Sequence, residues 1–188
     1  ISEELSLMRT TLAASMINAV VRNQKKGNLE GRLFEIAKKF IPKDLPLTEY
    51  PDERQTLCVA TFGAKEDFFT MKGIAEKVAE VLHVEFTYAN TQNTFLHPFQ
   101  TASISCEGVE IGYFGKLAYD IADECDMRVP MYIMEIDLEV LSKYYGKKAM
   151  FIPLPKFAEE QRDLAIVVDK AVTCGELEDT IKESCKYV

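Results

Sequence analysis

Histidines, paired cysteines and long apolar runs are scarce or missing in this sequence. His83 and His97 are the only histidines, so neither a histidine-rich metal site nor a conventional hydrolase triad is expected. The five cysteines are scattered without a Cys-x-x-Cys pair, which argues against a zinc site or redox motif and favours reduced cytoplasmic thiols. No apolar run approaches the roughly 20 residues of a membrane span, and no signal peptide is expected.

Basic residues are also fewer than acidic ones. The chain has 22 lysines and arginines against 30 acidic residues, a net charge of −8. This balance argues against a surface devoted mainly to nucleic-acid phosphates and leaves room only for a local basic patch. The hydrophobic content of 47% is that of a soluble globular protein, and 188 residues suit one domain with a small second piece. Because the sequence starts at Ile1 without an initiator methionine, we expect an excised fragment.

An amphipathic helix is predicted within residues 5–27. Thr10 or Thr11 can cap its start and Gly27 can end it. Its apolar positions recur with helical spacing and cover about half of the cylinder, whereas a helix lying on one sheet needs a stripe of only about 100°. We therefore expect this helix to be covered by its own domain and by another subunit; a core helix of a single domain is the alternative. The apolar residues are Leu12, Ala13, Met16, Ile17, Val20 and Val21.

The rest of the chain reads as an antiparallel sheet backed by helices, an α+β fold. A proline-rich loop over residues 41–55 separates the first two strands, and Gly108 makes a hairpin turn between two later ones. Strands are predicted at residues 32–40, 56–62, 84–89, 101–106, 109–114 and 131–136, with helices at 67–82 and from 137 to about 145.

The order of several short motifs resembles one family closely. Residues 9–12 (Arg-Thr-Thr-Leu), the long helix, a glycine turn and residues 32–36 (Arg-Leu-Phe-Glu-Ile) come first. Asp67, two aromatics and Lys72-Gly73 then open a helix, and a glycine-spaced strand end follows at residues 112–117. Together they resemble the beta subunit of bacterial phenylalanyl-tRNA synthetase. The resemblance implies a class II synthetase-like, non-catalytic core over residues 1–152.

The same resemblance implies that residues 153–188 begin a ferredoxin-like anticodon-binding domain and stop short of completing it. Prolines at 153 and 155 mark the boundary, residues 161–169 would form the first strand, and Thr173 with Glu176 would form a capping box. Two departures from the family pattern stand out. Phe99 and Gln100 follow the His-Pro pair in place of a small residue and an arginine, and residues 158–161 replace a proline and a basic residue.

No catalytic residue is predicted. An active class II synthetase needs a strand arginine on the ATP α-phosphate and a glycine-rich strand that ends in a second arginine, because these cations neutralise charge on the phosphates. Arg32 and Glu35 lie near the first position with a different spacing, and Gly115 is followed by Lys116. We therefore treat Arg32, Glu35 and His97 as remnants of such a site. For His97, a turn residue held by Pro98 is the simpler interpretation, and no metal site is expected.

The resemblance also implies a function. The chain would support the ATP-dependent attachment of phenylalanine to tRNA(Phe) by scaffolding the catalytic alpha subunit and positioning tRNA, in an assembly of two alpha and two beta chains in the cytoplasm. ATP and Mg²⁺ would serve the full enzyme, with no cofactor in this chain. The subunit-interface candidates are Leu12, Met16, Ile17, Val20 and Val21. Two alternatives are an active class II synthetase or ATP-dependent ligase, and a stand-alone amino-acid-binding regulatory module of the same fold.

Overall fold

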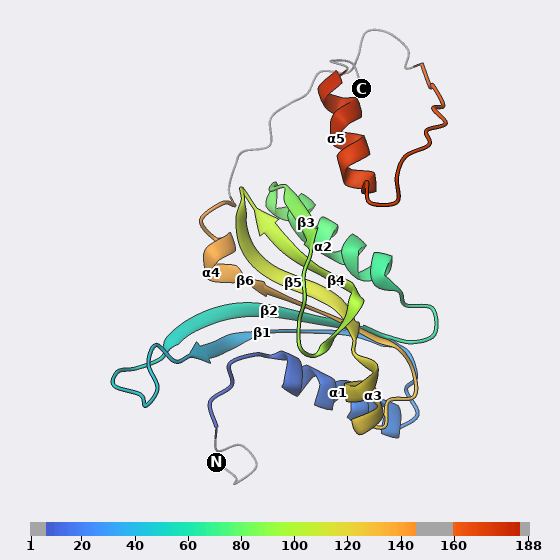
Figure 1. The fold of residues 1–188 in the computed structure, drawn as a ribbon. Helices are drawn as coiled ribbons and strands as arrows, with labels where there is room; N and C mark the ends of the chain where they lie inside the picture. The colour runs from blue at the N-terminus through green and yellow to red at the C-terminus, as the bar shows by residue number, and fades with distance from the viewer. Residues whose placement is uncertain (1–6, 146–159, 185–188) are drawn as a thin grey trace. The chain divides into compact units, whose positions relative to one another are not determined.

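A computed structural model of the chain describes residues 7–145 and 160–184 (Figure 1). The chain divides into two compact units, Ile1–Ala149 and Met150–Val188. The predicted boundary between residues 152 and 153 lies outside the described residues.

The first unit is built on a six-stranded sheet in which every pair of neighbouring strands is antiparallel. The strand order is β1-β2-β6-β5-β4-β3, which places the last strand of the unit near the middle of the sheet. The predicted antiparallel α+β architecture is therefore confirmed. The strands are β1 (Gly31–Ile41), β2 (Asp52–Phe62), β3 (Phe86–Asn90), β4 (Leu96–Cys106), β5 (Val109–Leu117) and β6 (Met131–Asp137).

Helices cover both faces of this sheet (Figure 1). On one face, α1 (Ala13–Lys25) and the short α3 (Tyr119–Glu124) pack over β2 and β6. On the other face, α2 (Phe68–Leu82) and the single-turn α4 (Leu138–Leu141) cover β4, β5 and β6. Among the described residues, no helix has both the length and the apolar character needed to cross a membrane.

Strand β6 shows why the sequence can build two cores at once. Side chains alternate between the faces of a strand, so Met131 and Ile133 pack under α1 while Met134 and Ile136 pack under α2. All seven residues of β6 are buried. This burial extends to Glu135, which shares the α1 face with Met131 and Ile133 and needs hydrogen-bond partners there.

Gly112 allows β5 and β6 to approach closely. It pairs with Ile136, and a Cβ atom at this position would lie 2.0 Å from the backbone oxygen of Glu135. Any side chain here would therefore push the two central strands apart. The glycine spacing that the sequence shows at residues 112–115 has this packing role in the structure, since a Cβ on Gly115 would lie 2.6 Å from the backbone oxygen of Gln100.

Several predicted boundaries differ from the structure. Strand β2 begins at Asp52, so residues 52–55 belong to a strand and not to the predicted loop. The reason is that backbone pairing with β1 continues as far as Ile41, which lies opposite Asp52. The Lys38–Glu53 ion pair also bridges the two strands, at 2.7 Å. Strand β4 begins at Leu96, which places His97 in a strand and not in a turn. The ladder between β4 and β5 is irregular between Leu96 and Thr101, where Pro98 has no N–H to donate. Helix α4 ends at Leu141, four residues earlier than predicted.

In the second unit, the described residues contain one helix, α5 (Cys174–Ser184). Its predicted capping box is confirmed: the Thr173 backbone N–H donates to the Glu176 carboxylate at 2.7 Å, and the Glu176 N–H donates to the Thr173 hydroxyl at 3.3 Å. The strand predicted at 161–169 is wrong, since residues 160–169 have no regular structure. A strand needs a partner for its backbone hydrogen bonds, and none pairs with this segment among residues 160–184.

Candidate functional site

Helix α1 is capped by a side chain from the middle of the sheet. Leu12 occupies the N-cap position and its own side chain makes no capping bond. Instead, the Glu135 carboxylate oxygen Oε1 accepts from the backbone N–H groups of Leu12 (2.6 Å) and Ala13 (2.9 Å) and from the Thr11 hydroxyl (2.7 Å). Thr11 contributes further by accepting from the Ala13 N–H at 3.0 Å. The predicted cap by Thr10 or Thr11 is therefore incomplete, because the main acceptor lies more than 120 residues away in the sequence.

The second oxygen of Glu135 is engaged from the neighbouring strand. The Tyr113 hydroxyl donates to Oε2 at 2.8 Å, and Tyr113 is the cross-strand partner of Glu135 on β5. Cys58 is the partner on β2. Burial, and then the nearby Glu135 carboxylate, raise the pKa of both the Tyr113 hydroxyl and the Cys58 thiol. Both groups therefore stay protonated at neutral pH, which keeps Tyr113 a hydrogen-bond donor to Glu135.

This environment predicts a large contrast in thiol reactivity. The thiolate is the reactive form, and Cys58 is fully buried with a raised pKa, whereas Cys174 on α5 is exposed. We expect an alkylating reagent at pH 8 to modify Cys174 rapidly in the native protein and to leave Cys58 unmodified until denaturant is added. Mass spectrometry of tryptic peptides measures both sites in one sample. Equal rates at Cys58 and Cys174 in the native protein would show that the α1 face is open to solvent.

The two predicted remnants on β1 are held by separate ion pairs. Arg32 donates through Nε and Nη2 to the Glu66 carboxylate at 3.2 and 3.1 Å, and 59% of its side chain is exposed. Glu35 accepts from Arg9 at 2.9 Å. Arg32 and Glu35 therefore pair with two different residues of this chain and not with each other.

His97 lies in a different part of the sheet. Its Nδ1 accepts from the Phe99 N–H at 3.2 Å, and its ring makes an edge-on contact with Tyr119 at a centroid distance of 5.3 Å. Strands β2, β6 and β5 separate β4 from β1. The structure therefore does not bring His97 together with Arg32 and Glu35, and the three residues do not form one site.

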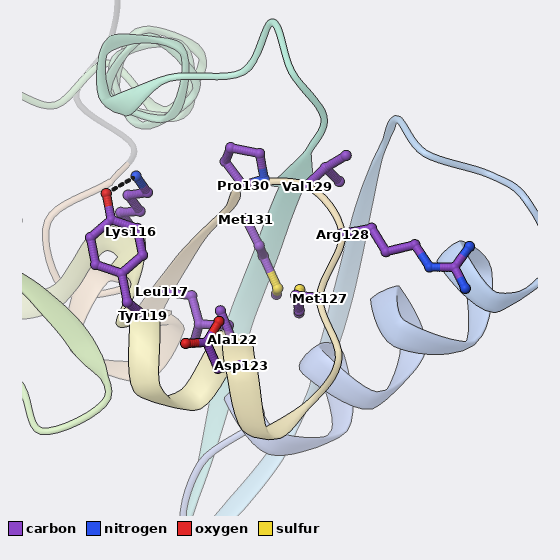
Figure 2. Close-up of a pocket in the computed structure, with 10 residues that line it drawn as sticks. All are labelled: Lys116, Leu117, Tyr119, Ala122, Asp123, Met127, Arg128, Val129, Pro130 and Met131. Atoms are coloured by element: carbon purple, nitrogen blue, oxygen red, sulfur yellow. Dashed lines mark hydrogen bonds between the residues drawn. The ribbon is translucent and has the colours of Figure 1, made fainter.

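A cavity of about 220 Å³ between the end of β5, α3 and the segment before β6 was not indicated by any sequence motif (Figure 2). Lys116 donates to the Tyr119 hydroxyl at 2.9 Å on one side of it, and Met127 and Met131 line its apolar floor. In Figure 2 the guanidinium of Arg128 points away from Lys116. Two cations thus line the cavity: Lys116, which is bonded to Tyr119, and Arg128, whose guanidinium lies apart from Lys116. Among the described residues, no cluster of three or more metal-ligating side chains is present.

The predicted interface residues are mostly inside the chain's own core. Four of them, Leu12, Met16, Ile17 and Val20, are between 0 and 8% exposed, and Val21 is half-buried against the same cluster. Their contribution to a subunit interface stays a prediction, because the described chain already covers most of their surface. The exposed side of α1 carries the small residues Ala14 and Asn18 and, one turn further on, the charged Arg22. A partner that meets this helix meets that side first.

Comparison with known proteins gives a consistent family. Residues 1–138 match the model of the phenylalanyl tRNA synthetase beta chain CLM domain. The phenylalanine–tRNA ligase beta subunits of Clostridium acetobutylicum and Clostridium tetani are 33% and 34% identical over 184 residues, and that of Bacillus subtilis is 30% identical over 194. Each alignment covers 97% of this chain but only 23–24% of the relative.

The fold has a likeness among solved structures. Pyrrolysyl-tRNA synthetase from Desulfitobacterium hafniense superposes with a TM-score of 0.58 over 71% of this chain and 48% of that chain, at 17% sequence identity. This likeness concerns the fold alone and supports the synthetase-like architecture of the sheet and its helices. The family model and the sequence relatives carry the assignment, and the chain belongs to the phenylalanyl-tRNA synthetase beta chain family, with residues 1–138 corresponding to its CLM domain.

Proposed function

We propose that this chain is the synthetase-like, non-catalytic part of a phenylalanine–tRNA ligase beta subunit. It would support the ATP-dependent attachment of phenylalanine to tRNA(Phe) by scaffolding the alpha subunit and positioning tRNA. The observation that carries the proposal is the similarity to beta subunits along 97% of the chain. Since the chain spans about a quarter of those relatives, the proposal assigns to it one part of the work of a larger subunit.

The arrangement of charges supports a role without catalysis. Adenylate formation needs cations placed on the phosphates. The arginines on or beside the first two strands are engaged by carboxylates of this chain: Arg9 by Glu35, Arg32 by Glu66, and Arg54 by Asp52 and Asp137. The position after the β5 glycines is Lys116, which bonds to Tyr119. We therefore assign phenylalanine, ATP and Mg²⁺ to the alpha subunit.

The proposed assembly contains two alpha and two beta chains in the cytoplasm, and residues 153–188 would begin a ferredoxin-like anticodon-binding domain. Within this assembly we assign the exposed side of α1 to the alpha subunit. Ala14 and Asn18 are exposed there and Val21 is half-buried. Small side chains such as Ala14 and Asn18 allow a second helix to approach closely, so the first half of this side is suited to helix packing.

Co-purification with the alpha subunit from the same source tests the scaffolding role. We expect the wild-type chain to bind and Asn18→Glu to bind at least about tenfold more weakly, because an unpaired charge in a contact that excludes water is costly. Val81→Glu is the matched control, since Val81 is exposed on α2 at the other face. If the wild-type chain fails to bind, the scaffolding role is wrong. If both variants bind as well as the wild type, the exposed side of α1 is not the contact.

Direct binding of tRNA by this chain is expected to be weak. With a net charge of −8, the chain can neutralise few phosphates, and counterion release then contributes little affinity. A tRNA titration at near-physiological salt should give a dissociation constant no tighter than the non-specific range of roughly 10⁻⁴–10⁻⁶ M. Submicromolar binding that prefers tRNA(Phe) over other tRNAs would contradict this prediction.

A further inference from the structure

Glu135 lies at the centre of the sheet and is only 3% exposed, an unusual position for a carboxylate. Its carboxylate accepts four hydrogen bonds from two directions. Three come from residues 11–13 at the start of α1 and one comes from Tyr113 on β5. A carboxylate is costly to bury unless its oxygens are hydrogen-bonded. These donors therefore make the buried position of Glu135 tolerable.

The start of α1 needs an acceptor as much as Glu135 needs donors. The first N–H groups of a helix have no partner within the helix, and the helix dipole favours a negative charge at this end. The N-cap residue Leu12 has no side-chain oxygen to offer. Glu135 supplies the acceptor for the Leu12 and Ala13 N–H groups from β6, a strand that is itself fixed between β2 and β5.

Apolar packing alone would leave the position of α1 loosely defined. Leu12, Met16 and Val20 hold the helix on the sheet, but burial of apolar area has no preferred direction. Hydrogen bonds do have a preferred distance and angle. The bonds to Glu135 therefore define where α1 begins along the sheet and how it is rotated.

We infer that Glu135 is a positioning residue: it fixes the start of α1 on β6 and thereby sets the exposed side of α1 that would face the alpha subunit. The role of Glu135 in fixing α1 concerns this chain alone, whereas its link to the alpha subunit rests on the proposed function.

Three variants separate positioning from general stability. Glu135→Met has a similar size and removes all four acceptor contacts. Glu135→Gln keeps the shape and one acceptor oxygen but removes the charge. Tyr113→Phe is the matched control, because it removes the hydroxyl that bonds to Oε2 and leaves the contacts to Leu12 and Ala13 in place.

Amide hydrogen exchange of the 188-residue chain measures whether Glu135 fixes the start of α1. Hydrogen bonds to charged groups are strong enough that their loss should accelerate exchange of the Met16 and Ile17 amides by about 10- to 100-fold in Glu135→Met. Glu135→Gln should give a smaller acceleration, and Tyr113→Phe should stay within about threefold of wild type at these amides. The β2–β6 ladder should keep its protection in all three.

Two exchange results would overturn the positioning role. One is wild-type exchange of the Met16 and Ile17 amides in both Glu135 variants. The other is an equal acceleration in α1 and in the β2–β6 ladder, which would make Glu135 an ordinary core residue. Should Glu135→Met fail to fold, Glu135→Gln against Tyr113→Phe decides the question.

Binding to the alpha subunit tests whether the position of α1 matters for assembly. We expect Glu135→Gln to bind at least about tenfold more weakly than Tyr113→Phe, since α1 would no longer present one fixed surface. Unchanged affinity together with a loosened α1 would overturn the link to assembly. If the wild-type chain itself does not bind, the proposed function fails, while the exchange experiment still decides whether Glu135 positions α1.

Discussion

Replacing Gly112 with alanine is expected to destabilise the first unit by about 3 kcal/mol or more. The added Cβ would lie 2.0 Å from the Glu135 backbone oxygen and 3.0 Å from the Ile136 Cα. Both atoms are backbone of β6, which is buried along its whole length, so neither can move aside like a flexible side chain. Urea unfolding followed by circular dichroism measures the free energy of unfolding directly.

Gly73→Ala is the matched control for this substitution. Gly73 lies within α2, and a Cβ there would have nothing within 4 Å. Alanine is favoured over glycine inside a helix by about 0.5–1 kcal/mol, so this variant should be as stable as the wild type or slightly more stable. A Gly112→Ala protein that unfolds at the wild-type urea concentration would show that β5 and β6 are not packed as described.

Replacing Val20 with glutamate is expected to destabilise the first unit by about 3–5 kcal/mol, enough to unfold much of the protein. Val20 is fully buried between α1 and the sheet, and a charge there would have no solvent. Asn18→Glu introduces the same charge on the exposed side of α1 and should stay folded. Thermal melts of the two variants test this contrast, and a Val20→Glu protein with a wild-type melting temperature would place Val20 at the surface.

This pair of variants tests whether the apolar side of α1 is core of its own chain, while a second cover by another subunit stays a prediction. The wide apolar surface predicted a helix covered from two directions. In the structure, one chain covers most of it, because β1, β2 and β6 lie beneath α1 while α3 and the segment around Met127 close over its side. Periodicity gives the width of an apolar face, but it does not say whether the second cover comes from the same chain or from another.

Most of the sheet could be predicted from local pattern. The strands around Leu33, Cys58 and Ile133 alternate apolar side chains or form short apolar runs, and their turns contain glycine or proline. The ends of the strands are harder to predict from the sequence. Polar residues such as Asp52 and Glu53 suggest a loop, yet they continue a backbone ladder that depends on the partner strand and not on side-chain polarity.

The contact that organises the candidate site could not be predicted. Glu135 reads locally as the polar end of a strand, and Leu12 reads as an ordinary core residue. Only the fold places the Glu135 carboxylate 2.6 Å from the Leu12 nitrogen. The family resemblance suggests Arg32, Glu35 and His97 as remnants of a site, but it does not give their positions in space. Arg32 and Glu35 share β1, and three strands separate that strand from His97 on β4.

Pyrophosphate exchange with phenylalanine, ATP and Mg²⁺ tests the central claim that this chain scaffolds and does not catalyse. The chain alone, free of alpha subunit, should show no exchange above background, because its arginines on or beside the first two strands are engaged by its own carboxylates. The alpha subunit with this chain bound should show exchange that Arg32→Ala in this chain leaves unchanged. Exchange that stays with the purified chain and is lost in Arg32→Ala would contradict the account.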